Sequence, residues 1–417
     1  MSGVKKKLLK NFFSLSMLQG LNYLIPIITM PYLFRTLGSY YFGVLAIATA
    51  AINYLVVITD YGFNFIATKD ISVNRENKEK LIEIYSSVLT IKLLLCLLCF
   101  FILLLILFFS KQDCFFIQVY IFTYGIVLGQ SLFSTWFFQG VEEMKYITLI
   151  NVVFKLSATL FIFIIVRSKD DVLFVPIISS LGYILSGLAS FFIIQRKYLI
   201  SFQPQTLMTI KVYFSKNWNM FISNFFTLLY RNSNVLILGF FSSASIVASY
   251  AIAEKIIKAI QSIQMIFGTA CYPYLAKKFN NDHSSFYEIS KKYWLIILLA
   301  YFLLTLIVYF LSPVAIYYST GYNDFMAIQL MKIMSFLILF GGLNYTLGVL
   351  GLIPMGYSKY FSNSVVITGI FSITLSALLS KYYGGYGASI SIVLCEVLLL
   401  VALSLKIKSL YLSRGRK

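Results

Sequence analysis

The chain has 417 residues, of which 59% are hydrophobic and only 12% are charged, and its mean hydropathy is +0.85. Because roughly a quarter of the residues of an ordinary soluble domain are charged, this composition excludes a water-soluble fold. The formal net charge of +19 does not indicate nucleic-acid binding, because the basic residues are concentrated in alternate loops, as membrane topology requires.

Long apolar runs follow one another along the whole chain. A helix needs roughly 20 apolar residues to cross the hydrocarbon core of a bilayer. The spacing leaves no room for a separate soluble domain. The sequence predicts about twelve transmembrane helices, at residues 11–34, 41–65, 83–109, 115–138, 147–166, 172–194, 218–240, 247–275, 293–316, 326–352, 360–380 and 386–405.

The basic residues set the expected orientation of these helices. The loops and tails on the side of the N-terminus contain 23 Lys and Arg residues, the opposite loops contain 5, and the other 6 lie within helices. Cytoplasmic loops carry the excess of Lys and Arg in membrane proteins. Both termini are therefore predicted to be cytoplasmic.

The helices are expected to form two six-helix lobes. The N-lobe comprises residues 1–194, the cytoplasmic linker 195–217, and the C-lobe with its basic tail 218–417. Six crossings return the chain to its starting side, so two such copies are parallel and related by an axis along the membrane normal. The predicted fold class is an all-α polytopic membrane protein with two pseudo-symmetric lobes around a central cleft.

A weak internal repeat with an offset of 205 residues supports the two lobes, since residues 43–48 align with 248–253. At the same offset, four positions spaced by 3, 4 and 3 residues share one face of the first and of the seventh predicted helix. These four pairs are Gln19 with Asn224, Asn22 with Thr227, Pro26 with Arg231 and Thr29 with Asn234. In the second and eighth predicted helices, Thr49 aligns with Glu254 and Asn53 with Lys258. Each lobe is thus expected to keep a polar face, which is charged only in the second.

Two further signals concern the cytoplasmic ends of the helices. The turn QGVEEMKY at residues 139–146 is loosely matched by MGYSKY at residues 355–360. Trp136, Trp218 and Trp294 all lie near predicted cytoplasmic helix ends, where aromatic side chains form a belt at the membrane interface.

Nine ionisable residues lie within the predicted helices, and each would cost on the order of 3 kcal/mol at the centre of a helix that faces lipid. Most are therefore expected to face a cavity, a partner or the interface. Asp60 and Lys332 lie near helix ends, where they either line a cavity or extend to the interface. Glu254 and Lys258 have the spacing of an ion pair. The remaining five are Lys92, Lys155, Arg231, Lys255 and Glu396.

Six of these residues are cations and three are anions, which gives the cleft a net charge of +3 if all are ionised. Such a cleft suits an anionic passenger. The predicted substrate-binding residues are Arg231, Lys258, Lys255, Lys155, Lys92, Asn224, Thr227 and Asn234, and the candidates for ion coupling are Asp60, Glu254 and Glu396. The sequence contains no phosphate-binding glycine loop, nucleophile motif or metal-ligand cluster, so no catalytic residue, cofactor or metal is predicted.

Several short motifs occur in an order typical of one family of membrane proteins. They are PYLFRTLG at residues 31–38, YFG at 41–43, and WFFQG at 136–140 with Met144 and Lys145. With the twelve helices in two lobes, they make the chain resemble, over essentially its full length, the O-antigen flippases (Wzx type). These belong to the polysaccharide transporter family of the multidrug/oligosaccharidyl-lipid/polysaccharide exporter superfamily.

The resemblance implies a multi-pass protein of the bacterial inner membrane that acts in lipopolysaccharide biosynthesis. Its implied activity is the transfer of undecaprenyl-pyrophosphate-linked oligosaccharide from the cytoplasmic to the periplasmic leaflet by alternating access, coupled to an ion. A pyrophosphate passenger agrees with a cationic cleft. The implied partners are the lipid bilayer and the polymerase and chain-length regulator of the same pathway, and no nucleic acid.

Two alternatives remain at this point. An O-antigen polymerase, which is a membrane glycosyltransferase, needs a sizeable periplasmic loop for the growing glycan, whereas the periplasmic loops predicted here are mostly under ten residues long. A multidrug or cation antiporter of the same superfamily is expected to have an acidic lumen rather than one with a net positive charge. We expect a transporter and no enzymatic activity.

Overall fold

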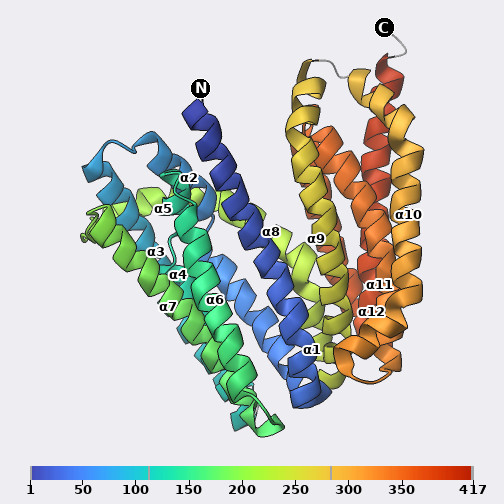
Figure 1. The fold of residues 1–417 in the computed structure, drawn as a ribbon, viewed down its shortest axis with the longest axis horizontal. Helices are drawn as coiled ribbons and strands as arrows, with labels where there is room; N and C mark the ends of the chain where they lie inside the picture. Colours follow the sequence, from blue (N-terminus) through green and yellow to red (C-terminus); the bar gives the residue numbers. More distant parts are fainter. Residues whose placement is uncertain (1, 111–112, 282–283, 415–417) are drawn as a thin grey trace. The chain divides into compact units, whose positions relative to one another are not determined.

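The computed structural model describes residues 2–110, 113–281 and 284–414, which form helices and short connections and contain no strand. Within helices, some side chains lie outside the described part, including those of residues 2–19 and of Arg231. The chain divides into two compact units, unit 1 (Met1–Leu228) and unit 2 (Leu229–Lys417) (Figure 1). The all-α polytopic class predicted from the sequence is confirmed.

Unit 1 begins with two transmembrane helices that are joined without a loop. The first helix, α1 (Ser2–Asp60), is kinked at Gly38, where φ is 81°. Glycine adopts this left-handed conformation without the steric penalty that other residues incur. The rest of unit 1 consists of α2 (Phe63–Val73), α3 (Lys78–Phe109), α4 (Cys114–Leu132), α5 (Thr135–Gly140), α6 (Lys145–Ile165), the 3-10 helix η1 (Lys169–Leu173), α7 (Phe174–Lys197) and the first part of α8 (Leu207–Phe241).

Unit 2 repeats this plan. It contains the end of α8, α9 (Ala244–Asn281), α10 (Ser284–Thr320), α11 (Phe325–Asn344), the π-helix η2 (Tyr345–Leu352) and α12 (Ser358–Arg414). A second kink, at Gly384 with a φ of 55°, divides α12. The junction between α8 and α9, at Ser242 and Ser243, lies close to the position that the 205-residue offset assigns to Gly38.

Eight segments of the described chain are long and apolar enough to span a bilayer. Two of them, Leu24–Val73 and Ser358–Tyr411, contain 50 and 54 residues. Each is therefore long enough for two crossings. The helices α8 and α9 have the length for the remaining two crossings of the predicted twelve.

Two predicted helices are interrupted where the sequence suggested continuous runs. The run at 115–138 breaks after Leu132, because the N–H of Ser134 bonds the hydroxyl of Ser190 on α7, at 3.1 Å, instead of a helical carbonyl. The run at 41–65 ends at Asp60, and the chain turns at Tyr61 and Gly62, which both have positive φ. A Cβ on residue 62 would lie 2.9 Å from the Cβ of Met220 on α8, so only glycine fits this contact.

A large cluster of buried side chains in unit 1 lies around α2, α3 and α5. Trp136, Phe137 and Phe138 are fully buried there, and Trp136 packs against Tyr85 with a centroid distance of 6.0 Å. Trp136 is therefore part of the core, and the prediction that it lies in an interfacial aromatic belt was wrong. Its position near a helix end was compatible with both environments.

The loosely matched turns after α5 and after the π-helix share their backbone structure at an offset of 214 residues. Glu142 and Gly356 occupy the same position and have φ values of 59° and 85°. Three backbone hydrogen bonds are equivalent in the two turns. In unit 1 the N–H groups of residues 141, 142 and 143 donate to the carbonyls of 137, 139 and 138, respectively. In unit 2 the N–H groups of residues 355, 356 and 357 donate to the carbonyls of 351, 353 and 352. The pseudo-symmetry therefore extends to individual hydrogen bonds.

A lysine of α7 in unit 1 and a lysine of α12 in unit 2 each lie over the tyrosine that follows this turn. Lys197 Nζ is 4.5 Å from the ring centroid of Tyr146, and Lys406 Nζ is 5.3 Å from that of Tyr360. Tyr146 and Tyr360 are also 214 residues apart. The repeated turn is thus held to its unit by an equivalent cation–π contact.

Candidate functional site within the transmembrane helices

An ion pair joins the two helix breaks of unit 1. Lys92 on α3 is 2% exposed, and its Nζ lies 3.0 Å from Oδ1 of Asp60, the last residue of α1. The same Nζ donates a hydrogen bond of 3.3 Å to the carbonyl of Gln130 in the last turn of α4. A cation is favourable at the carboxyl end of a helix, where carbonyl groups lack intrahelical partners.

Asn64 on α2 extends this junction. Its amide donates to Asp60, and its Oδ1 accepts a hydrogen bond of 3.0 Å from the hydroxyl of Thr135 at the start of α5. Asp60 and Lys92 were predicted to serve ion coupling and substrate binding, respectively. The structure brings them together in one partly buried pair that holds broken helices in place.

The other predicted cation of unit 1 has a different environment. Lys155 on α6 donates a hydrogen bond of 2.8 Å to Oδ1 of Asn22 on α1, and its Nζ lies 5.4 Å from the ring centroid of Tyr183. Asn22, Thr49 and Asn53, which the internal repeat assigned to a polar face, are all exposed. Unit 1 therefore has accessible polar positions at membrane depth besides its buried pair.

In unit 2 the charged residues gather on α9. Lys258 Nζ lies 3.1 Å from Oε1 of Glu254 and donates a hydrogen bond of 2.8 Å to Oδ1 of Asn232 on α8. The Glu254 side chain is 8% exposed, whereas that of Lys258 is 36% exposed, and Lys255 is exposed. The ion pair that the spacing suggested is formed, and it leaves the Lys258 side chain partly exposed.

A second polar contact of unit 2 lies where α11 becomes the π-helix. Asn344 donates hydrogen bonds from Nδ2 to the carboxylate of Glu396, at 2.6 Å, and to its backbone carbonyl, at 2.8 Å. Nearby, a Cβ on Gly341 would approach Nε2 of Gln261 on α9 to 2.9 Å. Since π-helices occur frequently at functional sites, this contact between α11 and α12 supports Glu396 as a candidate.

The remaining predicted residues occupy separate environments. Asn224 is half-buried, Thr227 is exposed and Asn234 is buried at 2% exposure. Lys332 on α11 lies over the ring of Tyr309, 5.3 Å from its centroid. The Arg231 side chain lies outside the described part of the structure.

These ion pairs leave the net charge of the residues within the helices unchanged. Each ion pair, Lys92 with Asp60 and Lys258 with Glu254, contains one cation and one anion, so the predicted excess of +3 is unchanged. Among the described residues, no group of three or more His, Cys, Asp or Glu side chains is arranged to hold a metal ion. The accessible lysines can attract and hold an anionic group by charge-assisted hydrogen bonds.

Several polar residues at this depth were not singled out from the sequence. Gln261 and Gln264 on α9 donate to the carbonyls of Leu337 and Ile338, at 3.0 and 3.2 Å. Both follow Lys258 at helical spacing, and this periodicity could have revealed them. Asn64 lies four residues after Asp60, and this helical spacing could also have revealed it. Asn232 and Asn344 are 26 and 52 residues from Lys258 and Glu396, so no local signal marked them.

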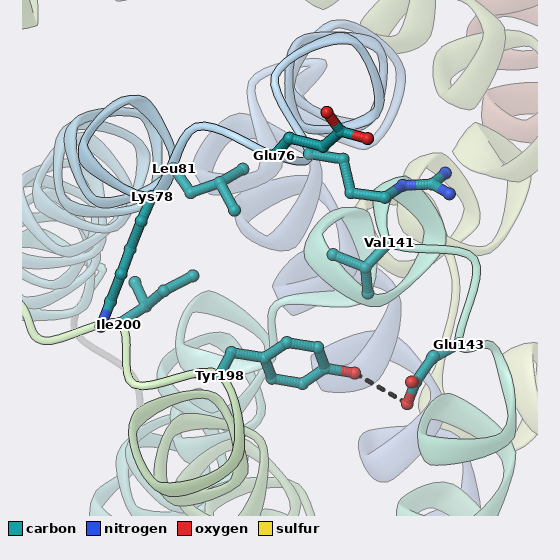
Figure 2. Close-up of a pocket in the computed structure, with 8 residues that line it drawn as sticks. Glu76, Lys78, Leu81, Val141, Glu143, Tyr198 and Ile200 are labelled. Atoms are coloured by element: carbon teal, nitrogen blue, oxygen red, sulfur yellow. Dashed lines mark hydrogen bonds between the residues drawn. The ribbon is translucent and has the colours of Figure 1, made fainter.

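A depression of about 350 Å³ lies outside the membrane-spanning segments of unit 1, at the α2–α3 turn, the α5–α6 turn and the end of α7 (Figure 2). Arg75 pairs there with Glu142 at 2.9 Å and donates to the carbonyl of Gly140 at 3.2 Å. Glu143 accepts hydrogen bonds from Lys197 and from the hydroxyl of Tyr198. Both polar pairs hold the repeated turn.

Two opposing effects set the acidity of Glu143. Partial burial favours its neutral form, but the hydrogen bonds from Lys197 and Tyr198 and the charges of Lys197 and Lys145 favour the carboxylate, and they lower its pKa below the ordinary value. Desolvation of the Tyr198 hydroxyl and its hydrogen bond to Glu143 raise the pKa of that tyrosine. Glu143 is therefore ionised at neutral pH.

The fold is similar to that of multi-pass membrane transporters of known structure. The structure is similar to that of the lipid II flippase MurJ in an inward closed conformation, with a TM-score of 0.64, 15% identity and coverage of 96% of this chain and 87% of the other. It is equally similar, by TM-score, to an inward-facing multidrug resistance MATE family transporter of the MOP superfamily, with 0.64, 11% identity and coverage of 96% and 99%. These similarities concern the fold.

The sequence comparisons identify the family. The model of the family described as "Polysaccharide biosynthesis protein" matches residues 8–279, which is more than half of the chain, and the chain belongs to this family. It is 28% identical to a putative O-antigen transporter of Shigella dysenteriae over 395 residues, covering 94% of this chain and 98% of the relative. A putative O-antigen transporter of Escherichia coli (strain K12) is 26% identical, with coverage of 94% and 95%.

These findings decide between a transporter and an enzyme. The chain is a transporter and not an enzyme such as a polymerase, because it belongs to this family and both relatives of similar length are named putative O-antigen transporters. The resemblance to the polysaccharide transporter family is confirmed.

Proposed function

We propose that this protein is a flippase that transfers undecaprenyl-pyrophosphate-linked oligosaccharide from the cytoplasmic to the periplasmic leaflet of a bacterial inner membrane. Family membership and the names of the two O-antigen transporters support a lipid-linked glycan as the passenger. In this proposal both termini are cytoplasmic, the 1–194 and 218–417 lobes alternate in access about a cleft, and residues 195–217 link them. The polymerase and chain-length regulator of the pathway receive the product.

The observation that carries the proposal is the presence of accessible cations at membrane depth. Lys258 is 36% exposed although it is ion-paired, and Lys255 is exposed one turn earlier on the same helix. Accessible lysines hold anionic groups by charge-assisted hydrogen bonds, and a pyrophosphate is such a group. Lys155, beside Asn22 and Tyr183 in unit 1, would assist, as would Arg231 and the polar residues Asn224, Thr227 and Asn234.

Ion coupling is the finer part of the proposal, and the pair Glu254 and Lys258 suggests a way to achieve it. A pyrophosphate that binds Lys258 competes with Glu254, whose carboxylate is 8% exposed. A buried carboxylate that loses its cation favours proton or cation uptake. Binding of the passenger would then be linked to binding of an ion. Asp60 and Glu396 are the alternative coupling residues.

The test is deletion of the gene followed by analysis of both leaflets. The expected result is that lipid-linked repeat units accumulate in the cytoplasmic leaflet and surface polysaccharide is lost. Plasmid-borne wild-type protein should restore export, whereas Arg231→Ala with Lys258→Ala should not, at equal expression. Normal translocation with altered chain length in the deletion strain would contradict the proposal.

A further inference from the structure

A stripe of four aromatic side chains runs along the first part of α8. Phe214, Trp218, Phe221 and Phe225 are spaced by 4, 3 and 4 residues, which places them on one face of the helix. The last three rings are in contact along the helix, with centroid distances of 5.7 Å between Trp218 and Phe221 and 5.8 Å between Phe221 and Phe225. We call these four residues the aromatic stripe.

Two tyrosines connect the stripe to the rest of unit 1: Tyr54 lies on α1, and Tyr61 directly follows the last residue of α1. Tyr61 stacks on Phe214, at 4.4 Å between centroids, and on Phe221, at 4.9 Å. Tyr54, seven residues earlier, meets Phe225 edge to face at 6.4 Å. The rings therefore form a continuous column that is anchored at the turn between α1 and α2.

The column is only partly covered. Phe214 and Trp218 are 38% and 49% exposed, and Phe221 and Phe225 are half-buried. Beside it lie polar groups that lack partners among the described residues. The hydroxyl of Tyr61 and Oδ1 of Asn217 are both buried without a hydrogen bond, and the two residues are 2% and 1% exposed. Buried polar groups without partners are rare and call for an explanation.

The surroundings distinguish this face from one that contacts lipid. On α3, exposed Phe101 is flanked at helical spacing by Leu94, Leu97, Leu98 and Leu105, which are all exposed and apolar. The aromatic stripe is instead flanked by Asn217 and Asn224, and the neighbouring face of α1 carries exposed Thr49 and Asn53. A lipid-facing surface does not accommodate so many amides and hydroxyls.

We propose that the aromatic stripe, with Tyr61, Asn217 and Asn224 beside it, binds the oligosaccharide part of the passenger. This inference rests on the proposed function. Aromatic faces carry a negative quadrupole, and the C–H groups on the face of a sugar ring are weakly positive, so sugar rings stack on aromatic rings. The hydroxyls around each sugar supply the hydrogen bonds that the tyrosine hydroxyl and the asparagine oxygen lack. The lysines of the transmembrane helices are then left for the pyrophosphate.

The test measures binding of two probes to purified wild-type protein in detergent. The first probe is the repeat-unit oligosaccharide released from its lipid by mild acid, and the second is a polyprenyl phosphate without sugar. The variants Trp218→Leu and Phe225→Leu remove a ring but keep an apolar side chain, and Tyr61→Phe removes only the hydroxyl. Phe101→Leu is the control, since it removes an exposed ring from an apolar face.

Each stripe variant is expected to weaken binding of the oligosaccharide about tenfold and to leave binding of polyprenyl phosphate unchanged. Phe101→Leu should change neither. The inference is overturned if the stripe variants bind the oligosaccharide as the wild type does, or if they lose the polyprenyl phosphate equally, because the rings would then contact the lipid tail. Equal unfolding temperatures confirm that each variant is folded.

The outcome is separable from that of the proposed function. If the deletion strain translocates its repeat units normally and the stripe variants still lose oligosaccharide binding, the flippase proposal fails and the sugar site stands. If the deletion strain accumulates repeat units and the stripe variants bind the oligosaccharide normally, the flippase proposal stands and the sugar site is wrong.

Discussion

The two units share a fold, but the charged residues within their helices differ in burial. In unit 1, Lys92 is 2% exposed and is used to join broken helices through Asp60 and Gln130. In unit 2, Lys258 is paired with Glu254, but its side chain is 36% exposed. The comparison shows that an intramembrane lysine can stabilise helix packing in one copy of a repeat and be a candidate for ligand binding in the other.

The equivalent turns show what the repeat preserved. The hydrogen bonds around Glu142 and Gly356 match, and in both units a lysine lies over the following tyrosine. The polar contacts of the two turns differ, because Arg75 and Glu143 hold the first with ion pairs. Backbone geometry was thus retained while the side-chain contacts diverged.

The largest expected effect tests the structural role of Lys92. Lys92→Met leaves Asp60 without its cation, and breaking a buried pair in this way should destabilise the protein by about 3–5 kcal/mol. Adding Asp60→Asn should recover much of that loss, because neither charge is then left alone. Thermal unfolding of the purified variants measures both changes. A stable Lys92→Met variant that fails in transport would instead place Lys92 in the binding site and break the contrast between the units.

Lys258 is expected to show the opposite behaviour. Lys258→Met should lower translocation of repeat units about tenfold or more, since a charge-assisted hydrogen bond contributes about 1.5–3 kcal/mol. Its unfolding temperature should change little in comparison with Lys92→Met. Lys381→Met, at an exposed position of α12, is the control and should transport normally. Loss of folding without a specific loss of transport would assign Lys258 a structural role as well.

The backbone conformation of the repeated turn can be tested at Gly356, where an added side chain would meet no neighbour. A Cβ on residue 356 meets nothing within 4 Å, but the φ of 85° disfavours any side chain. Gly356→Ala should therefore destabilise unit 2 by about 1–2 kcal/mol, measured as a lower denaturation temperature. Gly20→Ala is the matched control, since its Cβ also meets nothing and its φ is not positive. Equal stability of the two variants would show that the turn tolerates strain.

The smallest effect concerns the ion pair at the corresponding turn of unit 1. Glu143→Gln should cost about 1 kcal/mol at pH 7, because the pair is partly exposed. The pKa of Glu143 is lowered on folding, so its stabilisation is complete above the unfolded pKa of about 4.3 and is lost as the pH falls through the folded value. The unfolding temperatures of wild type and variant should differ above the unfolded pKa of about 4.3 and converge once the pH is below the folded pKa of Glu143, which is lower than that value. A difference that stays constant as the pH falls through both pKa values would exclude the ionic contribution.

The polytopic class and the repeat were predictable from the sequence because they depend on local properties. Apolar runs of sufficient length determine a membrane helix wherever they occur, and the 205-residue offset located the boundary between the helices on either side of Gly38 and of Ser243. The ion pair of Glu254 and Lys258 was also accessible, since residues four apart on a helix are neighbours.

Tertiary structure alone decided the other contacts. Lys92 and Asp60 are 32 residues apart, and Lys155 and Asn22 are 133 residues apart. Which of these meet depends on how separate helices pack, and the same dependence placed Trp136 in the core and broke the helix at Ser134, which bonds Ser190. The sequence by itself determined how many charges enter the membrane, because hydropathy is a sum over local residues. The packing of distant helices decided which of those charges are paired and which stay accessible.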